Sequence, residues 1–187
     1  MELPALTAYR LQGISMGRLE AIWLKRSRGG PMDSVHEVVA VGGRGLKGGA
    51  DFDQKRHVSL IEKEVFEGLE EELDAEVDLA KRRANFLVEG IQLRDTPGRT
   101  LIIGDLRIRI RGETKPCRIM DEAQEGLRTA LESQWRGGVH GRGWRFILAT
   151  CATFSPRNAN LFRCRTGGLD RPNGPRDRYC CSGGGGR

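Results

Sequence analysis

The chain has 187 residues with a formal net charge of +6 at pH 7, and 38% of the residues are hydrophobic. No stretch approaches the ~18 consecutive apolar residues of a membrane-spanning helix, and the beginning of the sequence lacks the pattern of a secretory signal peptide. These features exclude a helical membrane protein and favour a cytoplasmic domain that is large enough to form its own core.

The positive charge is confined to the end of the sequence. Residues 1–142 contain 23 Lys and Arg and 23 Asp and Glu, whereas residues 143–187 contain eight Arg and two Asp. The latter segment also holds four of the five cysteines and lacks Lys and Glu. We therefore expect an N-terminal extension over 1–15, a folded domain over 16–142, and an atypical Arg-, Gly- and Cys-rich tail over 143–187 that is disordered or frameshift-like. A body without net charge is not expected to bind nucleic acid.

The first part of the body predicts two strands and a glycine-rich loop. Residues 17–25 are apolar enough for a strand, and residues 34–41 are rich in the β-branched side chains that favour strands. The segment 42–55 contains five glycines and predicts a long turn. It is not a phosphate-binding P-loop, because Lys47 is followed by Gly48 rather than by Ser or Thr.

A helix is predicted after this loop. Ser59 and Glu62 have the spacing of a capping box, and apolar residues recur at helical intervals over Ile61–Leu73 beside an acidic outer face. Two further strands, separated by a turn, are predicted over residues 85–91 and 99–104.

The next strand leads to the single cysteine of the body. Apolar residues alternate with arginines over Leu106–Arg111, which predicts a strand with one buried face. Pro116 has no N–H and ends the strand ladder, and Cys117 follows between two cations, Lys115 and Arg118. Nearby positive charge favours a thiolate. Cys117 is thus either a small buried core residue or a nucleophile, a sulfur carrier or a soft metal ligand.

The remaining pattern predicts a mainly β fold. A second helix is expected to begin at Asp121 and to end at Gly137, and residues from Val139 lead towards another strand. Because the helices do not alternate regularly with the strands, we expect a β-barrel with two or three inserted α-helices. The sequence after Arg142 leaves it open whether this barrel is complete at its C-terminal end.

Several segments, in this order and spacing, resemble the MOSC domain family (molybdenum cofactor sulfurase C-terminal domain), in its small stand-alone form. They are GRLEAIWLKRSRGGPMDSV, GLKGGADFDQKRHVSLIEKE, RANFLVEGIQL followed by GRTLIIGDLRIRI, KPCRIM and RGGVHGR. The resemblance covers about residues 16–142, and the sequence after Arg142 does not resemble the family's closing strands.

The resemblance implies a β-barrel that binds the molybdenum cofactor (molybdopterin). Members of the family occur fused to pyridoxal-phosphate-dependent sulfurases, in amidoxime-type reductases, and alone in resistance to N-hydroxylated bases. It therefore implies a molybdenum-dependent oxidoreductase or a sulfur-carrier protein, acting in the reduction of N-hydroxylated compounds or in sulfur transfer. The implied protein partner is an electron donor or a sulfurase, and no membrane partner is expected.

The resemblance also implies roles for individual residues. Cys117 falls where the family has its single cysteine and would be the molybdenum ligand or the persulfide carrier, for which a soft thiolate is suited. Arg83 and Asn85 match the family's R-x-N motif and would hold the cofactor's phosphate or orient the pocket. The remaining expected cofactor-binding residues are Arg56 and His57, where the family often has Arg-Gln, and the cations Arg118 and Lys115.

Two alternatives of a different class remain open. One is a non-catalytic β-barrel binding module whose basic tail, residues 143–187, contacts nucleic acid or acidic partners. The other is a defective copy that has no present function.

Overall fold

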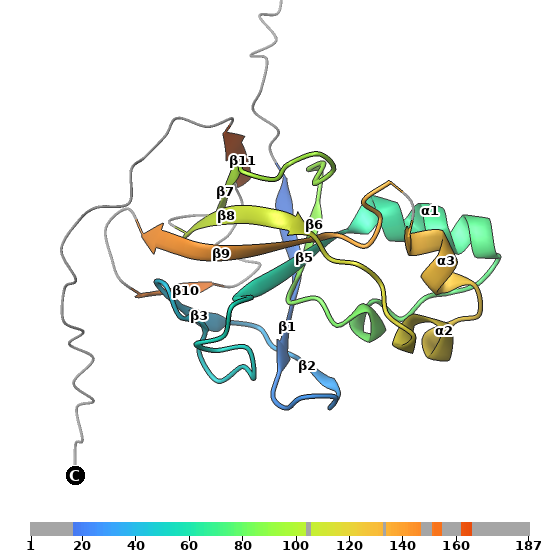
Figure 1. Cartoon of the computed structure of the whole chain (residues 1–187), viewed down its shortest axis with the longest axis horizontal. Helices are drawn as coiled ribbons and strands as arrows, with labels where there is room; N and C mark the ends of the chain where they lie inside the picture. The colour runs from blue at the N-terminus through green and yellow to red at the C-terminus, as the bar shows by residue number, and fades with distance from the viewer. Residues whose placement is uncertain (1–16, 104–105, 133, 147–150, 155–161, 166–187) are drawn as a thin grey trace, which may run out of the picture.

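The computed structural model describes residues 17–103, 106–132, 134–146, 151–154 and 162–165, and it is mainly β with helices gathered at one end (Figure 1). In the first half of the chain the elements are β1 Arg18–Lys25, β2 Met32–Ser34, β3 Val38–Val41, β4 Gly45–Leu46, β5 Val58–Glu62, α1 Lys63–Leu73, the 3-10 helix η1 Leu79–Arg82 and β6 Phe86–Glu89. The second half adds β7 Thr100–Ile103, β8 Leu106–Glu113, α2 Ile119–Ala123, α3 Leu127–Glu132, β9 Val139–Phe146, β10 Cys151–Phe154 and β11 Phe162–Arg165.

The strands form one large and one small sheet. The large sheet has the order β11-β7-β8-β9-β5-β6-β1-β2, and the small sheet has the order β10-β3-β4. β5 and β6 are parallel, whereas the other described pairs are antiparallel. The predicted mainly β fold with two or three inserted helices is confirmed. The large sheet stays open between β11 and β2 instead of closing into a barrel.

The alternation on β8 places its apolar residues in the core, as the sequence predicts. Leu106, Ile108 and Ile110 are fully buried, whereas Arg109 and Arg111 on the opposite face are exposed. The apolar side chains belong to a cluster to which every strand from β3 to β9 contributes, together with β1. Burial of each such side chain stabilises the fold by ~1.5–3 kcal/mol.

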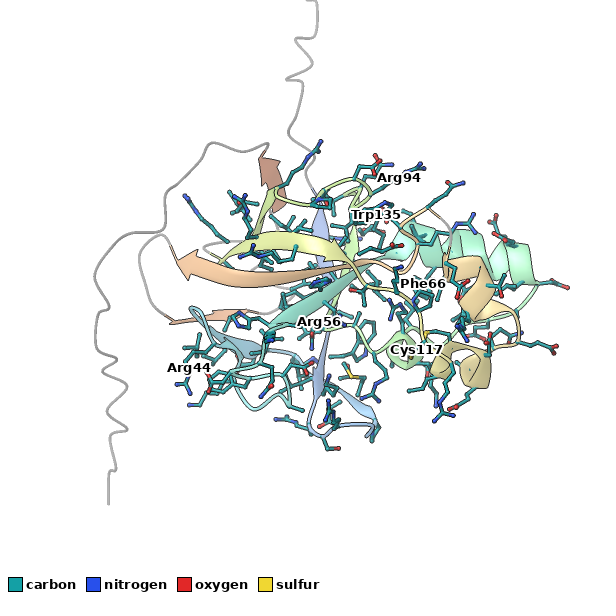
Figure 2. The ribbon with its side chains drawn as sticks, in the orientation of Figure 1. Arg44, Arg56, Phe66, Arg94, Cys117 and Trp135 are labelled. Carbon is teal, nitrogen blue, oxygen red and sulfur yellow. The ribbon has the colours of Figure 1, made fainter. Side chains whose placement is uncertain are left out.

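A second apolar cluster joins the helices to the sheet. Phe66 and Leu69 of α1 pack with residues of α2 and α3 and with Leu87 of β6. Figure 2 shows Phe66 on the helical side of the molecule. The neighbours of Leu87 on the same strand, Phe86 and Val88, belong to the first cluster. Since successive strand residues face opposite sides, β6 is buried on both faces and separates the two clusters.

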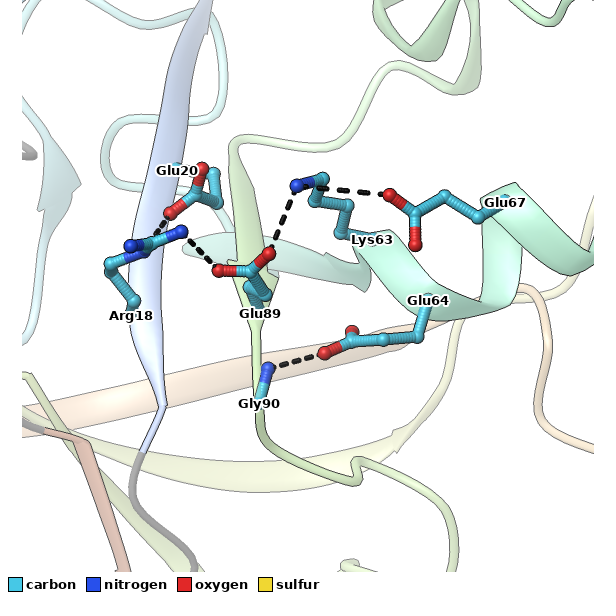
Figure 3. Close-up of polar contacts among 7 residues, drawn as sticks. All are labelled: Arg18, Glu20, Lys63, Glu64, Glu67, Glu89 and Gly90. Carbon is cyan, nitrogen blue, oxygen red and sulfur yellow. Dashed lines mark hydrogen bonds and ion pairs between the residues drawn. The ribbon is translucent and has the colours of Figure 1, made fainter.

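Charged residues tie α1 to the strands beside it (Figure 3). Glu89 on β6 binds Lys63 Nζ at 2.9 Å and also pairs with Arg18 of β1. Glu64 accepts a hydrogen bond from the backbone N–H of Gly90. Each exposed pair contributes only ~0–1 kcal/mol, so the network orients the helix more than it stabilises the fold.

The predicted start of the first helix was wrong. Ser59 lies within β5, opposite His140 of β9, and the helix begins only at Lys63. Glu62 is the N-cap residue, and no side chain caps this helix end. The capping-box spacing of Ser59 and Glu62 is overridden because β5 pairs with strands on both sides.

Two other predicted elements are divided in the structure. The strand expected over 34–41 becomes the end of β2 and the separate strand β3. The helix expected after Cys117 becomes α2 and α3, which are separated by Gly126 with a φ of 79°. A backbone in this left-handed region interrupts a helix.

The last strands extend past the predicted domain boundary at Arg142. β9 runs from Val139 to Phe146, β10 pairs with β3, and β11 pairs with β7. The predicted extension over 1–15 and the remainder of the tail lie outside the described residues, and the division into domains stays a prediction. Among the described residues, no helix has the length and apolar character required to cross a membrane.

Candidate cofactor-binding cleft

A cleft of about 780 Å³ lies where the loops of the sheet meet the helical end. Its walls come from the end of β1 and the loop after it, the loop before β5, the end of η1, and the segment between β8 and α2. The lining residues are Lys25, Arg28, Ala50, Asp51, Gln54, Lys55, Arg56, Ser59, Arg82, Arg83, Thr114, Lys115, Cys117, Ile119 and Met120. This volume is within the range of small-molecule sites.

Positive charge dominates the cleft. Seven of its lining residues are Lys or Arg, and Asp51 is the one acidic residue among them. The Asp51 carboxylate lies 2.5 Å from Nζ of Lys25, so its charge is already paired. The cleft is therefore suited to an anionic ligand.

Cys117 lies in the cleft as a free, exposed cysteine, and the alternative of a buried core residue is wrong. It follows Pro116 in the segment between β8 and α2. Its carbonyl oxygen accepts a hydrogen bond from the N–H of Met120 at 3.0 Å, at the start of α2. Figure 2 shows Cys117 on the helical side of the molecule and Arg56 near the start of β5.

Arg83 and Asn85 of the R-x-N motif have different surroundings. Arg83 lines the cleft, is half-buried, and donates a hydrogen bond to the carbonyl oxygen of Gly30. Asn85 is buried away from the cleft. Its Oδ1 accepts from the N–H of Ser59 at 3.0 Å, and its Nδ2 donates to the carbonyl oxygen of Trp23 at 3.2 Å. Asn85 therefore joins β1 and β5, and of the two it is Arg83 that lines the cleft.

The other predicted site residues divide in the same way. Arg56 and Lys115 line the cleft. His57 is only 4% exposed and lies with Asn85 on a separate cavity of about 10 Å³. Arg118 is exposed outside the cleft lining and pairs with Glu122 at 3.3 Å. Four of the predicted residues thus meet in one cleft, namely Cys117, Arg56, Arg83 and Lys115.

Arg82 is a cleft residue that the sequence patterns do not single out. It is buried, and its Nη2 donates to the carbonyl oxygens of Thr114, at 2.6 Å, and of Gly137. Burial lowers the pKa of Arg82 to about 10, although the nearby charge of Cys117 acts in the opposite direction. The only sequence signal is its place directly before the R-x-N motif. Lys25, Arg28 and Lys55 were missed because single Lys and Arg residues carry no motif that distinguishes them from other surface cations.

Gly137 allows this contact between Arg82 and the cysteine segment. A Cβ atom at Gly137 would lie 2.4 Å from the carbonyl oxygen of Thr114 and 3.3 Å from Nη2 of Arg82. Gly137 is thus needed for the close approach of the segment before β9 to the segment that carries Cys117.

Comparisons with known proteins agree with this fold. The family model of the MOSC domain matches residues 43–153, which extends past Arg142 into β10. No curated protein matches the sequence.

Solved structures are similar over most of the chain. The YuaD protein of Bacillus subtilis superposes with a TM-score of 0.65 at 12% identity, over 81% of this chain and 96% of that chain. YiiM from Geobacillus stearothermophilus has a TM-score of 0.57 at 17% identity, over 79% and 74% of the two chains. YiiM from Escherichia coli has a TM-score of 0.53 at 13% identity, over 82% and 72%. At these identities the likeness shows a common fold.

Proposed function

The chain belongs to the MOSC domain family, and on this basis we propose that its cleft binds the molybdenum cofactor with the sulfur of Cys117 as a metal ligand. The family is associated with this cofactor. The observation that carries the proposal is the presence of an exposed cysteine in a large cleft that is lined by seven cationic side chains.

The residues of the cleft fit the cofactor in charge and in donor type. The cofactor carries a phosphate, and arginine and lysine side chains form strong charge-assisted hydrogen bonds to phosphate oxygens. A thiolate is a soft ligand that suits molybdenum. The single lining carboxylate, Asp51, is neutralised by Lys25 and does not oppose an anion.

Within this proposal, Arg56, Arg83 and Lys115 hold the phosphate, with Arg28 and Lys55 as further cations on the same walls. Arg83 is suited to this role because its hydrogen bond to Gly30 restricts the guanidinium. When bound, the cofactor supplies two-electron redox chemistry at its metal. The chain's own residues bind and orient it, and Asn85 keeps β1 and β5 together behind the cleft.

Two chemistries are compatible with this site. In the first, an electron-donor protein supports the reduction of an N-hydroxylated compound. In the second, a sulfurase partner loads a persulfide on Cys117, which then carries the sulfur. The exposure of Cys117 supports both, because its sulfur is open to the cofactor's metal in the first case and to a sulfurase partner in the second.

The metal content of the purified protein tests the proposal. Wild type and Cys117→Ser are produced in cells that make the cofactor, and molybdenum and pterin are quantified separately per protein. We expect the variant to lose most of the molybdenum while it retains part of the pterin, because the cationic walls are intact. Equal molybdenum in both proteins would exclude Cys117 as the ligand.

The release of sulfur by cyanide separates the two chemistries. After incubation with a sulfur donor, a carrier yields thiocyanate from Cys117, and Cys117→Ser does not. Reduction of an N-hydroxylated substrate with a chemical electron donor identifies the reductase instead.

A further inference from the structure

We propose that the part of the cleft formed by Arg82 and Thr114 is a binding site for a small tetrahedral oxyanion, which lies beside Cys117. This inference goes beyond cofactor binding. It rests on two buried side-chain atoms, Nε of Arg82 and Oγ1 of Thr114, that have no hydrogen-bond partner within the described part of the chain.

The first of these groups is the guanidinium of Arg82. The side chain lines the cleft although the residue is only 6% exposed. Its printed hydrogen bonds go to two neutral backbone carbonyls, those of Thr114 and Gly137, and its buried Nε has no hydrogen-bond partner. None of the ion pairs within the described ranges involves Arg82. Glu113 acts on Arg82 without forming a direct ion pair. A buried positive charge without a directly paired counter-ion is costly, and an anion in the cleft offsets that cost.

The second group is the hydroxyl of Thr114. The residue is 7% exposed and lines the same cleft, and its Oγ1 is buried without a hydrogen-bond partner. Buried hydroxyl groups are normally hydrogen-bonded, so the Thr114 hydroxyl has an unused donor close to the cleft. A hydroxyl can donate to an anion as soon as one is present.

The two groups are held together and close to Cys117. The 2.6 Å hydrogen bond from Arg82 joins its guanidinium to the backbone of Thr114 itself. Cys117 lies three residues further along the same segment. Arg82 and Thr114 line the same cleft as Cys117. A guanidinium and a hydroxyl that each retain an unpartnered donor atom, on the same walls as a sulfur, favour an oxyanionic group of a substrate or product.

The reactivity of Cys117 provides a test in the full chain without cofactor. Cys117 is alkylated with iodoacetamide, a neutral reagent, and modification is quantified by mass spectrometry of the tryptic peptide 112–118. Sodium sulfate is the probe, and sodium chloride keeps the ionic strength constant. We expect sulfate to slow alkylation in a saturable manner. Alkylation that is equally fast in sulfate and chloride would overturn the proposal.

Thr114→Val tests the hydroxyl without removing any observed hydrogen bond of the side chain. If the hydroxyl only happens to be unpartnered, the variant is at least as stable and sulfate protects it as it protects wild type, which overturns the proposal. If the hydroxyl is a ligand, the sulfate concentration for half protection rises ~10-fold. Thr129→Val, on the exposed side of α3, is the matched control and keeps the wild-type protection.

Arg82→Gln tests the charge, and Arg82→Lys retains it. A folded Arg82→Gln variant that loses the sulfate protection, with partial protection in Arg82→Lys, supports the site, whereas unchanged protection in folded Arg82→Gln contradicts it. If Arg82→Gln does not fold, Thr114→Val decides the question. Because no cofactor is present, these results are independent of whether wild type retains molybdenum.

Discussion

Oδ1 of Asn85 accepts two hydrogen bonds from Ser59, one from its backbone N–H at 3.0 Å and one from its hydroxyl at 3.2 Å. The same side chain reaches Trp23 on β1 through Nδ2. This places the asparagine of the R-x-N motif behind the cleft, where it connects strands.

Asn85→Ala is therefore expected to lower the free energy of unfolding by ~2–3 kcal/mol, because it removes the side-chain partner of the half-buried Ser59 N–H and of the buried Trp23 carbonyl. Urea unfolding at neutral pH measures the change. Gln92→Ala, at an exposed position shortly after β6, is the control and is expected to change the free energy of unfolding little. A fully stable Asn85→Ala protein with impaired ligand binding would instead indicate direct contact with the ligand.

Two glycines offer a matched comparison of backbone approach. At Gly137 an added Cβ meets the Thr114 carbonyl oxygen at 2.4 Å, whereas at Gly68 on α1 nothing lies within 4 Å. We expect Gly137→Ala to destabilise the protein by ~2 kcal/mol or more and Gly68→Ala to stabilise it by ~0.5–1 kcal/mol. Thermal unfolding of both variants checks the opposite signs, and a neutral Gly137→Ala would show that the segment before β9 moves freely.

Local patterns predicted those parts of the fold in which the signal comes from neighbouring residues. The alternation of Leu106, Ile108 and Ile110 identified β8, and helical spacing identified the buried Phe66 and Leu69 of α1. The beginning of α1 could not be predicted from the capping-box spacing alone, because pairing of β5 with β6 and β9 keeps Ser59 in a strand.

The candidate site was predictable to the extent that its residues lie in one segment. Lys115 and Cys117 lie two residues apart after a strand end, and Arg83 lies in a short motif. Arg82 gives no periodic signal because η1 is only four residues long, and its partners lie 32 and 55 residues away. The motif itself does not distinguish Arg83, which faces the cleft, from Asn85, which is buried behind it.

Glu62 predicts a pH dependence of stability. Burial raises the pKa of its carboxyl from 4.5 to about 7, although the hydrogen bond from the Leu93 N–H at 2.9 Å opposes the shift. Between these two values the folded state binds more protons than the unfolded state, so the stability falls as the pH rises through this window. Above pH 7 the full penalty applies, at most ~3 kcal/mol.

Glu62→Gln removes this penalty and keeps an oxygen that can accept the Leu93 hydrogen bond. We expect the variant to be more stable than wild type at pH 8 and similar to it at pH 4, as measured by urea unfolding across the pH range. Glu71→Gln, at an exposed position on α1, is the control and does not reproduce the difference. A difference between Glu62→Gln and wild type that is the same at every pH would contradict the titration of Glu62.

The cationic walls of the cleft predict which arginines matter for cofactor retention. Arg56 and Arg83 line the cleft, whereas Arg118 lies outside it in an ion pair with Glu122. Loss of one charge-assisted hydrogen bond to a phosphate corresponds to a ~10-fold lower affinity, so Arg56→Gln and Arg83→Gln are expected to retain much less pterin than wild type. Arg118→Gln is the matched control, because it replaces an arginine that does not line the cleft. This variant is expected to retain as much pterin as wild type. Pterin fluorescence per protein, measured after identical washing, gives the comparison.

Equal retention by Arg118→Gln and Arg83→Gln, with both below wild type, would mean that general surface charge rather than the cleft holds the cofactor.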